Sequence, residues 1–139
     1  MKIHLELKNA AFHLEAKNEE GATVHIDGSK EIGGENLGFT PMQLLLAGAG
    51  GCSAIDVISI LKKQKQKIES LRIEVEGEKE KVESHSEWRK IHLKFLLEGV
   101  IDKEKAVKAL DLSMERYCSV SKSLQPKSTF TYEIRVNGH

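Results

Sequence analysis

Two cysteines carry the most reactive side chains in this chain of 139 residues. Cys52 lies within the apolar stretch TPMQLLLAGAGGCSAIDVISILKK at residues 40–63, and Cys118 follows the segment ALDLSMERY. A cysteine thiolate is a nucleophile, and a second thiol nearby can capture the sulfenic acid that the first one forms on oxidation. The opposing interpretation is that each cysteine is a small buried hydrophobe, because free cysteine is among the most buried residue types. Both interpretations stay open on composition alone.

The surroundings of the two cysteines differ. Small residues lie near Cys52 on the chain, so a small molecule could reach its sulfur; they are Gly48, Gly51 and Ser53. Two cations flank Cys118, since Arg116 precedes it and Lys122 follows it. Positive charge near a thiol favours the thiolate. The sequence therefore predicts easy access at Cys52 and an activating charge at Cys118.

The stretch around Cys52 has the marks of one long helix. Thr40 is a preferred N-cap, Pro41 suits the first helical position, and the basic segment LKKQKQK favours an end near Lys65. A membrane span needs roughly 20 apolar residues, but polar side chains interrupt this stretch, and an unpaired aspartate near a bilayer centre is costly. We therefore expect no membrane insertion but a central helix, apolar on nearly all sides, that a homodimer covers. The small residues expected to let two such helices approach are Ala47, Gly48, Ala49, Gly50, Gly51 and Ala54.

Asp56 lies one helical turn beyond Cys52, on the same helix face. Its negative charge by itself disfavours a thiolate at Cys52. Three roles remain open for Asp56: pairing with a lysine or arginine across the dimer, accepting a hydrogen bond from a serine, or being a satisfied polar residue at the dimer seam.

Alternating apolar and polar residues predict strands on both sides of this helix. Lys2–Lys8, Ala11–Lys17 and Ala22–Gly28 indicate a three-stranded meander, and a polar, glycine-rich loop at residues 28–38 leads to the helix. Residues 70–80 and 87–99 indicate an antiparallel pair. An amphipathic helix follows from its N-cap Asp102 to Tyr117 or Cys118, and residues 128–138 form a last strand. The prediction is a single α+β domain over residues 1–139, in the order β-β-β-α-β-β-α-β, with helices on antiparallel sheets.

Composition narrows the partners and the compartment. Lys plus Arg and Asp plus Glu number 21 each, so no net charge favours nucleic acid or an anionic membrane surface. The first residues alternate charged and apolar side chains, unlike a signal peptide, and we expect a cytoplasmic protein with reduced cysteines. The six histidines lack metal-ligand spacing, so we expect no metal.

The stretch at residues 40–63, together with ALDLSMERYCSVSKSL, resembles the OsmC/Ohr superfamily (osmotically inducible protein C and organic hydroperoxide resistance), most closely its YhfA-like branch. The two cysteine motifs stand 66 positions apart, and the resemblance extends over nearly the whole chain. It implies an OsmC-like fold, with antiparallel sheets around central buried helices in an intertwined homodimer. It also implies sites at the subunit interface, each formed by one cysteine of the central helix and one of the second helical region.

Carried over by motif position, the resemblance makes Cys52 the nucleophile that attacks an organic hydroperoxide and Cys118 the thiol that resolves its sulfenic acid. An external dithiol reductant would then reduce the disulfide, and no cofactor is expected. Pocket or supporting roles fall to residues near the two cysteines and near the start of the helix; these are Met42, Gln43, Asp56 and Ser119.

The chain departs from the family pattern at two positions. The hydroperoxide reductases carry an early arginine and a glutamate directly after the proline that opens the helix. Here Met42 follows Pro41, and no arginine precedes Arg72. Lys17 and Lys30 are the replacements available in the early region, and lysine lacks the planar fork of arginine. Two functions therefore remain open: a thiol-dependent hydroperoxide reductase, or a dimeric binding or redox-sensing module whose pocket holds a small apolar or thiol-reactive ligand.

Overall fold

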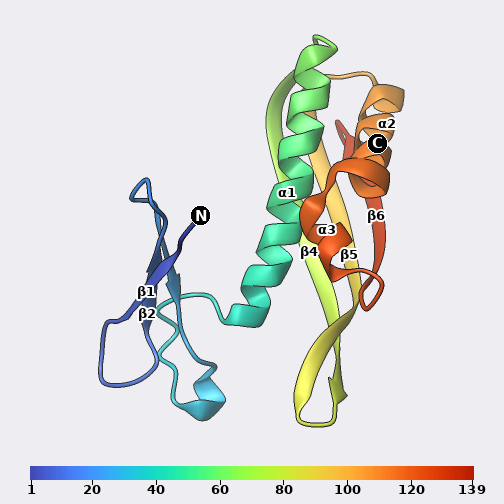
Figure 1. The fold of residues 1–139 in the computed structure, drawn as a ribbon. Coiled ribbons are helices and arrows are strands. Elements are labelled where there is room, and N and C mark those ends of the chain that lie inside the picture. Colours follow the sequence, from blue (N-terminus) through green and yellow to red (C-terminus); the bar gives the residue numbers. More distant parts are fainter. The chain divides into compact units, whose positions relative to one another are not determined.

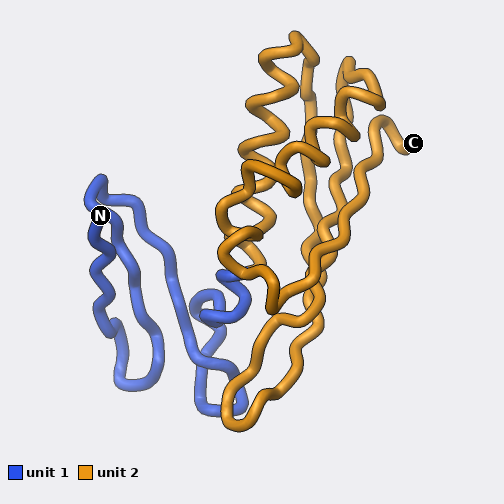
Figure 2. The backbone as a smooth tube through the Cα atoms, turned by 45° about the vertical axis from the view of Figure 1, so that its right-hand side comes forward, with its two compact units in different colours: residues 1–45 blue, residues 46–139 orange.

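The computed structural model describes all 139 residues, which form two compact units. Unit 1 comprises Met1–Leu45 and unit 2 comprises Leu46–His139 (Figure 2). The helix that carries Cys52, α1 (Pro41–Lys63), begins in unit 1 and continues through unit 2. A single domain over the whole chain stays a prediction.

Unit 1 is built on the predicted meander. Strands β1 (His4–Leu7), β2 (Leu14–Lys17) and β3 (Thr23–Ile26) pair antiparallel in the order β1-β2-β3. The register aligns apolar residues in two rows across the strands, so that one face of this sheet is apolar. These rows are Leu5, Ala16 and Val24, and Leu7, Leu14 and Ile26. Leu5, Leu7 and Val24 are exposed, which leaves much of the apolar face open.

A buried carboxylate organises the loop between β3 and α1. Asp27 is 2% exposed and accepts hydrogen bonds from the backbone amides of Gly28 (2.7 Å), Glu35 (3.2 Å) and Leu37 (3.1 Å). The amide of Leu37, followed by those of Glu35 and Gly28, lowers the pKa of Asp27 against the opposing effect of burial. The predicted loop therefore has a fixed course, which includes the 3₁₀ turn η1 (Lys30–Ile32).

The ends of α1 follow from its flanking residues. The Gln43 amide donates to Thr40 Oγ1 (3.3 Å), and the Thr40 amide donates to Gln43 Oε1 (2.9 Å), so the two residues form a capping box. At the other end Lys65 has a positive φ of 59°. The backbone amide of Lys65 donates a hydrogen bond to the Lys62 carbonyl, and the amide of Gln66 donates one to the Leu61 carbonyl. This pair of bonds is a Schellman motif, which ends the helix at Lys63, two residues before the predicted end.

Unit 2 contains a second sheet of three strands, in the order β4-β5-β6. Strands β4 (Lys67–Val82) and β5 (His85–Val100) form the predicted antiparallel pair. Strand β6 (Thr129–Val136) pairs parallel to β5, where the sequence had predicted antiparallel sheets throughout. The reason is that a helical crossover joins β5 to β6 and returns the chain in the same direction. The predicted α+β class is confirmed with this one parallel pair.

One face of the second sheet forms the core of unit 2. Its alternating apolar side chains include the fully buried Ile91, Leu93, Phe95 and Leu97 of β5. Helix α1 lies along this face (Figure 1), and Gly50 permits the close approach. A Cβ on Gly50 would lie 2.8 Å from Val75 Cγ2 on β4. The inward face of α1 is Ala49, Gly50, Ser53, Val57 and Leu61.

The crossover from β5 to β6 has three helical pieces. Helix α2 (Lys103–Leu112) begins at the predicted N-cap Asp102, whose carboxylate accepts from the Glu104 amide (2.9 Å). It continues into a π-turn, η2 (Ser113–Tyr117), so the helical segment ends at Tyr117 as predicted. The short helix α3 (Ser119–Leu124) then follows Cys118 and was not predicted.

Candidate functional site

The two cysteines both lie in unit 2, on different helical elements. Cys52 is in the middle of α1 and half-buried, whereas Cys118 lies between η2 and α3 and is 0% exposed. The Cys118 thiol lies 4.0 Å from the carbonyl oxygen of Ala49, one turn before Cys52 on α1. The Cys52 thiol is close enough to raise the pKa of the Cys118 thiol. Two thiols that are distant in the sequence are thus neighbours in space.

Burial governs the ionisation of Cys118. Desolvation raises the pKa of the Cys118 thiol, and the Cys52 thiol raises it further. Hydrogen bonds from the side chain and the backbone of Ser121 oppose this rise without cancelling it. The expectation that Arg116 and Lys122 activate Cys118 is therefore wrong. Both cations are exposed, and the sulfur lies inside the fold. Cys118 is a protonated thiol at neutral pH.

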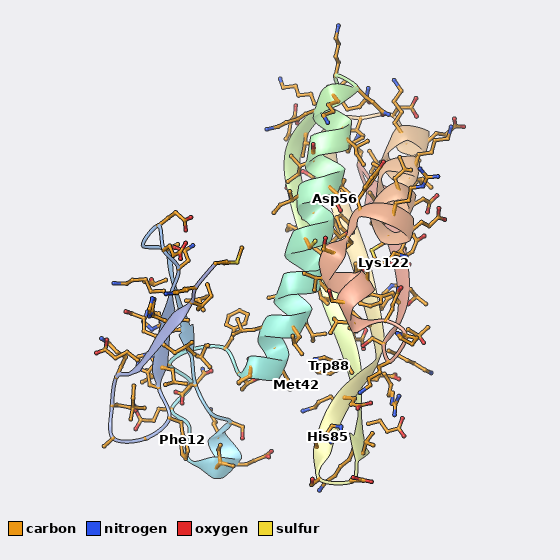
Figure 3. The ribbon with its side chains drawn as sticks, viewed as in Figure 1. Phe12, Met42, Asp56, His85, Trp88 and Lys122 are labelled. Atoms are coloured by element: carbon orange, nitrogen blue, oxygen red, sulfur yellow. The ribbon has the colours of Figure 1, made fainter.

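Asp56 belongs to a small polar network between α1 and η2. The Ser113 hydroxyl donates to Asp56 Oδ2 (2.8 Å), and the Ser113 and Ser53 hydroxyl oxygens lie 3.2 Å apart. Ser53 and Ser113 are both 0% exposed. Of the three roles considered for Asp56, the hydrogen bond from a serine is the one the structure contains. Figure 3 labels Asp56 on α1, and Lys122 on α3.

The other predicted site residues have separate positions. Met42 and Gln43 lie in unit 1, in the first turn of α1, and the Gln43 side chain is held by the capping box. Ser119 is exposed at the start of α3, and its carbonyl accepts a hydrogen bond from the Ser123 hydroxyl (2.8 Å). The structure therefore brings Cys52, Asp56 and Cys118 into one unit with Ser119 beside them.

Two serines near Cys118 were not predicted from the sequence. The Cys118 amide donates to the Ser113 carbonyl (2.7 Å), and the Ser121 hydroxyl donates to the Cys118 carbonyl (3.1 Å). Ser121 is also 0% exposed. The available signal was that Ser113 interrupts the apolar face of an amphipathic helix, where a hydroxyl needs a partner.

The small residues of α1 serve two different faces. Ala49 and Gly50 are buried within unit 2, so the prediction that they lie against a second copy is wrong. Ala47, Gly51 and Ile55 follow one another at four-residue spacing and are exposed, Ile55 by 68%. Nothing lies within 4 Å of a Cβ placed on Gly51. The outward face of α1 is thus apolar, consists partly of small residues, and is exposed to solvent.

Two further possibilities concern membranes and metals. Helix α1 is long and apolar enough to cross a membrane by length and composition, a test that core helices also pass. Its inward face packs on the sheet of unit 2. No group of three or more potential metal-ligating side chains occurs, although His13 Nε2 and His25 Nδ1 lie 2.9 Å apart in unit 1.

Comparisons with known proteins agree with this architecture. Residues 33–133 match the family described as OsmC-like protein. Protein YhfA of Escherichia coli strain K12 is 39% identical over 98 residues, which cover 70% of this chain and 72% of that protein. A hypothetical protein from Aquifex aeolicus VF5 has a crystal structure that is 28% identical, with a TM-score of 0.78 over 98% of this chain and 96% of that one.

A more distant structure has the same fold. An organic hydroperoxide resistance protein OsmC from Legionella pneumophila is 18% identical, with a TM-score of 0.72 over 98% of both chains. At this identity the likeness shows the fold alone. The resemblance drawn from the two cysteine motifs is confirmed by the family match.

Proposed function

The chain belongs to the OsmC-like family, and we propose that it is a cysteine-based redox protein that reduces hydroperoxides with Cys52 and Cys118. The observation that carries the proposal is the position of two free thiols that stand far apart in the sequence: the Cys118 sulfur lies 4.0 Å from the Ala49 carbonyl, one turn before Cys52 on α1. Their positions on α1 and at the junction of η2 with α3 give one thiol access and keep the other protected.

The difference in burial supports a distinct role for each cysteine. Cys52 is half-buried and so can meet a substrate, whereas Cys118 is fully buried with a raised pKa. The reactive form of cysteine is the thiolate, so the buried, protonated Cys118 is a poor first nucleophile. Cys52 is therefore the residue that attacks, and Cys118 the residue that resolves.

The reaction runs in three balanced steps. The Cys52 thiolate attacks one oxygen of the hydroperoxide, an S–O bond forms, the O–O bond breaks, and the alkoxide takes a proton to leave as an alcohol. The Cys118 sulfur then attacks the sulfenic sulfur, which forms the Cys52–Cys118 disulfide and releases water. An external dithiol reduces that disulfide by thiol–disulfide exchange and is itself oxidised. The two electrons come from the two protein thiols.

The same proposal includes a cytoplasmic homodimer. Proteins of the OsmC-like family are commonly dimeric. In this chain the outward face of α1, formed by Ala47, Gly51 and Ile55, is apolar and open. Exposed apolar patches of this kind mark interaction surfaces. A second copy of the chain covers this face by packing its own α1 against it, and a reducing compartment keeps both thiols reduced between cycles.

The experiment is a mapping of thiols after reaction with one equivalent of cumene hydroperoxide under anaerobic conditions. The account expects the loss of both free thiols and a peptide pair joined by a Cys52–Cys118 disulfide. Cys118→Ser should instead accumulate a sulfenic acid on Cys52 that dimedone traps, and Cys52→Ser should not react. Two intact thiols in the wild type after this treatment would overturn the proposal.

A second candidate function rests on the start of α1. The family's glutamate is absent there, and the neutral Gln43 side chain is engaged in the capping box with Thr40. Without that carboxylate, an interface pocket of the proposed dimer would serve as a binding or redox-sensing module for a small apolar or thiol-reactive ligand. Formation of the disulfide with a disulfide reagent but not with hydroperoxides would favour this second function.

A further inference from the structure

We propose that Asp56 and Ser113 are positioning residues that hold the π-turn η2 and thereby keep the Cys118 thiol beside Cys52. The inference rests on the proposed function, because it concerns the same pair of thiols. It assigns these two residues no contact with substrate. Their task is to set how readily the two cysteines form a disulfide.

The side chain of Ser113 has two partners on α1, Asp56 and Ser53. The Ser113 hydroxyl has one proton, which it donates to the Asp56 carboxylate in the shorter of its two contacts, at 2.8 Å. In the other contact, at 3.2 Å, the Ser53 hydroxyl is then the donor and the Ser113 oxygen is the acceptor. Ser53 and Ser113 are both 0% exposed, so no water replaces these bonds easily. Asp56 thus anchors the start of η2, where it continues from α2, to α1.

The backbone of Ser113 bonds to Cys118. The Ser113 carbonyl accepts the Cys118 amide at 2.7 Å, across the five-residue spacing of a π-turn. Ser113 therefore makes two links: its side chain bonds to the Asp56 carboxylate on α1, and its carbonyl bonds to the Cys118 backbone amide. If the side-chain anchor is lost, the π-turn is free to relax toward ordinary helical spacing, and Cys118 shifts along α1.

The Cys118 thiol lies against α1 near Ala49. Its sulfur is 4.0 Å from the Ala49 carbonyl, and Ala49 and Ser53 are one turn apart on the same inward face. Asp56 is one turn beyond Cys52. The α1 residues that contact the anchor and the Cys118 thiol thus lie on successive turns of one helix, so movement of the anchor is transmitted over a short distance.

The first test follows the Cys118 amide and thiol without any hydroperoxide. In a Cys52→Ser background, Asp56→Ala and Ser113→Ala should each speed hydrogen exchange of the Cys118 amide by about tenfold or more, the scale of a lost bond to a charged group. Alkylation of Cys118 should accelerate similarly. Asp56→Asn retains an oxygen acceptor for the Ser113 hydroxyl and should restore values near those of the Cys52→Ser parent.

Matched controls separate the anchor from a general change of charge or hydroxyl content. Glu115→Gln removes a carboxylate from η2 itself, at an exposed position. Ser123→Ala removes a hydroxyl from α3 that bonds only to the Ser119 carbonyl. Both variants should exchange and alkylate like the parent.

The second test is the equilibrium with glutathione, in which glutathione disulfide oxidises the protein dithiol to the Cys52–Cys118 disulfide and yields two molecules of glutathione. With both cysteines present, Asp56→Ala and Ser113→Ala should shift this equilibrium constant by about tenfold toward the dithiol. Asp56→Asn, Glu115→Gln and Ser123→Ala should stay close to the wild type.

The outcomes distinguish this inference from the proposed function. Neither test uses a hydroperoxide, so a wild type inert to hydroperoxides would overturn the function and leave the anchor to be judged by these readouts. If Asp56→Ala and Ser113→Ala lower thermal stability but leave exchange, alkylation and the glutathione equilibrium as in their parents, the two residues are structural only. That result overturns the inference. If Asp56→Ala does not fold, Ser113→Ala and Asp56→Asn decide it.

Discussion

Asp27 and Cys118 show how the same burial gives opposite results for two acidic side chains. Both are almost fully buried, and burial alone raises the pKa of either group. Asp27 has three backbone amides aimed at its carboxylate, which outweigh burial and lower its pKa. The bonds from Ser121 to Cys118 are too few to do the same, so its pKa stays raised.

Asp27 should make the order of the loop at residues 28–38 depend on acidic pH. Because its pKa in the folded chain is lowered, its stabilising effect is full above the unfolded value of about 3.9 and is lost as pH falls through the lower folded value. A pH titration of the Glu35 and Leu37 amide resonances should therefore give a midpoint below about 3.9. A midpoint above that value would contradict the account, and Asp27→Asn should abolish the transition.

Cys118 should resist ionisation even when its neighbour is removed. Burial is the largest cause of its raised pKa, and Cys52→Ser leaves that burial in place. In this variant the ultraviolet absorbance of the thiolate should appear only above the ordinary cysteine pKa of about 8.5. A thiolate already present at neutral pH would show that Cys118 is activated and would reverse the two assigned roles.

At the scale of elements, the contact between α1 and β4 depends on a missing side chain. A Cβ on Gly50 would lie 2.8 Å from Val75 Cγ2, whereas one on Gly48 would make an ordinary contact with Val120 Cγ1 at 3.7 Å. Both alanine variants gain the same helix propensity. Gly50→Ala should therefore be less stable than Gly48→Ala by about 1–3 kcal/mol, the usual cost of overpacking. Urea unfolding of both variants measures the difference, and equal stabilities would show that β4 moves aside at no cost.

The sequence predicted those elements whose signals are local. The three-stranded meander, the capped start of α1 at Thr40 and the N-cap Asp102 all follow from alternation or from capping residues. The parallel direction of β6 could not be read in this way, because alternation is the same in parallel and antiparallel edge strands.

The features missed from the site have the same cause. The π-turn η2 and the helix α3 are short, and no periodicity in the chain distinguishes a π-turn of five residues or a helix of six residues. The pairing of Cys52 with Cys118 came from the family resemblance rather than from spacing. The burial that raises the Cys118 pKa became visible only in the folded chain.

At the scale of the whole molecule, the exposed apolar face of α1 is the surface on which the proposed dimer depends. Ile55 is 68% exposed in the middle of α1, directly after the run of small residues at positions 47–54. We expect the wild type to sediment as a dimer and Ile55→Asp to sediment as a monomer, because a charge at a buried helix contact has no partner. Val100→Asp is the control, since Val100 is also exposed but lies at the end of β5. A monomeric wild type at micromolar concentration would contradict the proposed assembly.

The central claim is that Cys52 attacks hydroperoxides and Cys118 completes the reaction. Its most direct test is stopped-flow reaction of the fully reduced protein with cumene hydroperoxide and with hydrogen peroxide. The account predicts a reaction far faster than that of free cysteine, abolished by Cys52→Ser and, in Cys118→Ser, halted at the sulfenic acid. A wild-type rate equal to that of free cysteine, or a rate that survives in Cys52→Ser, would contradict it.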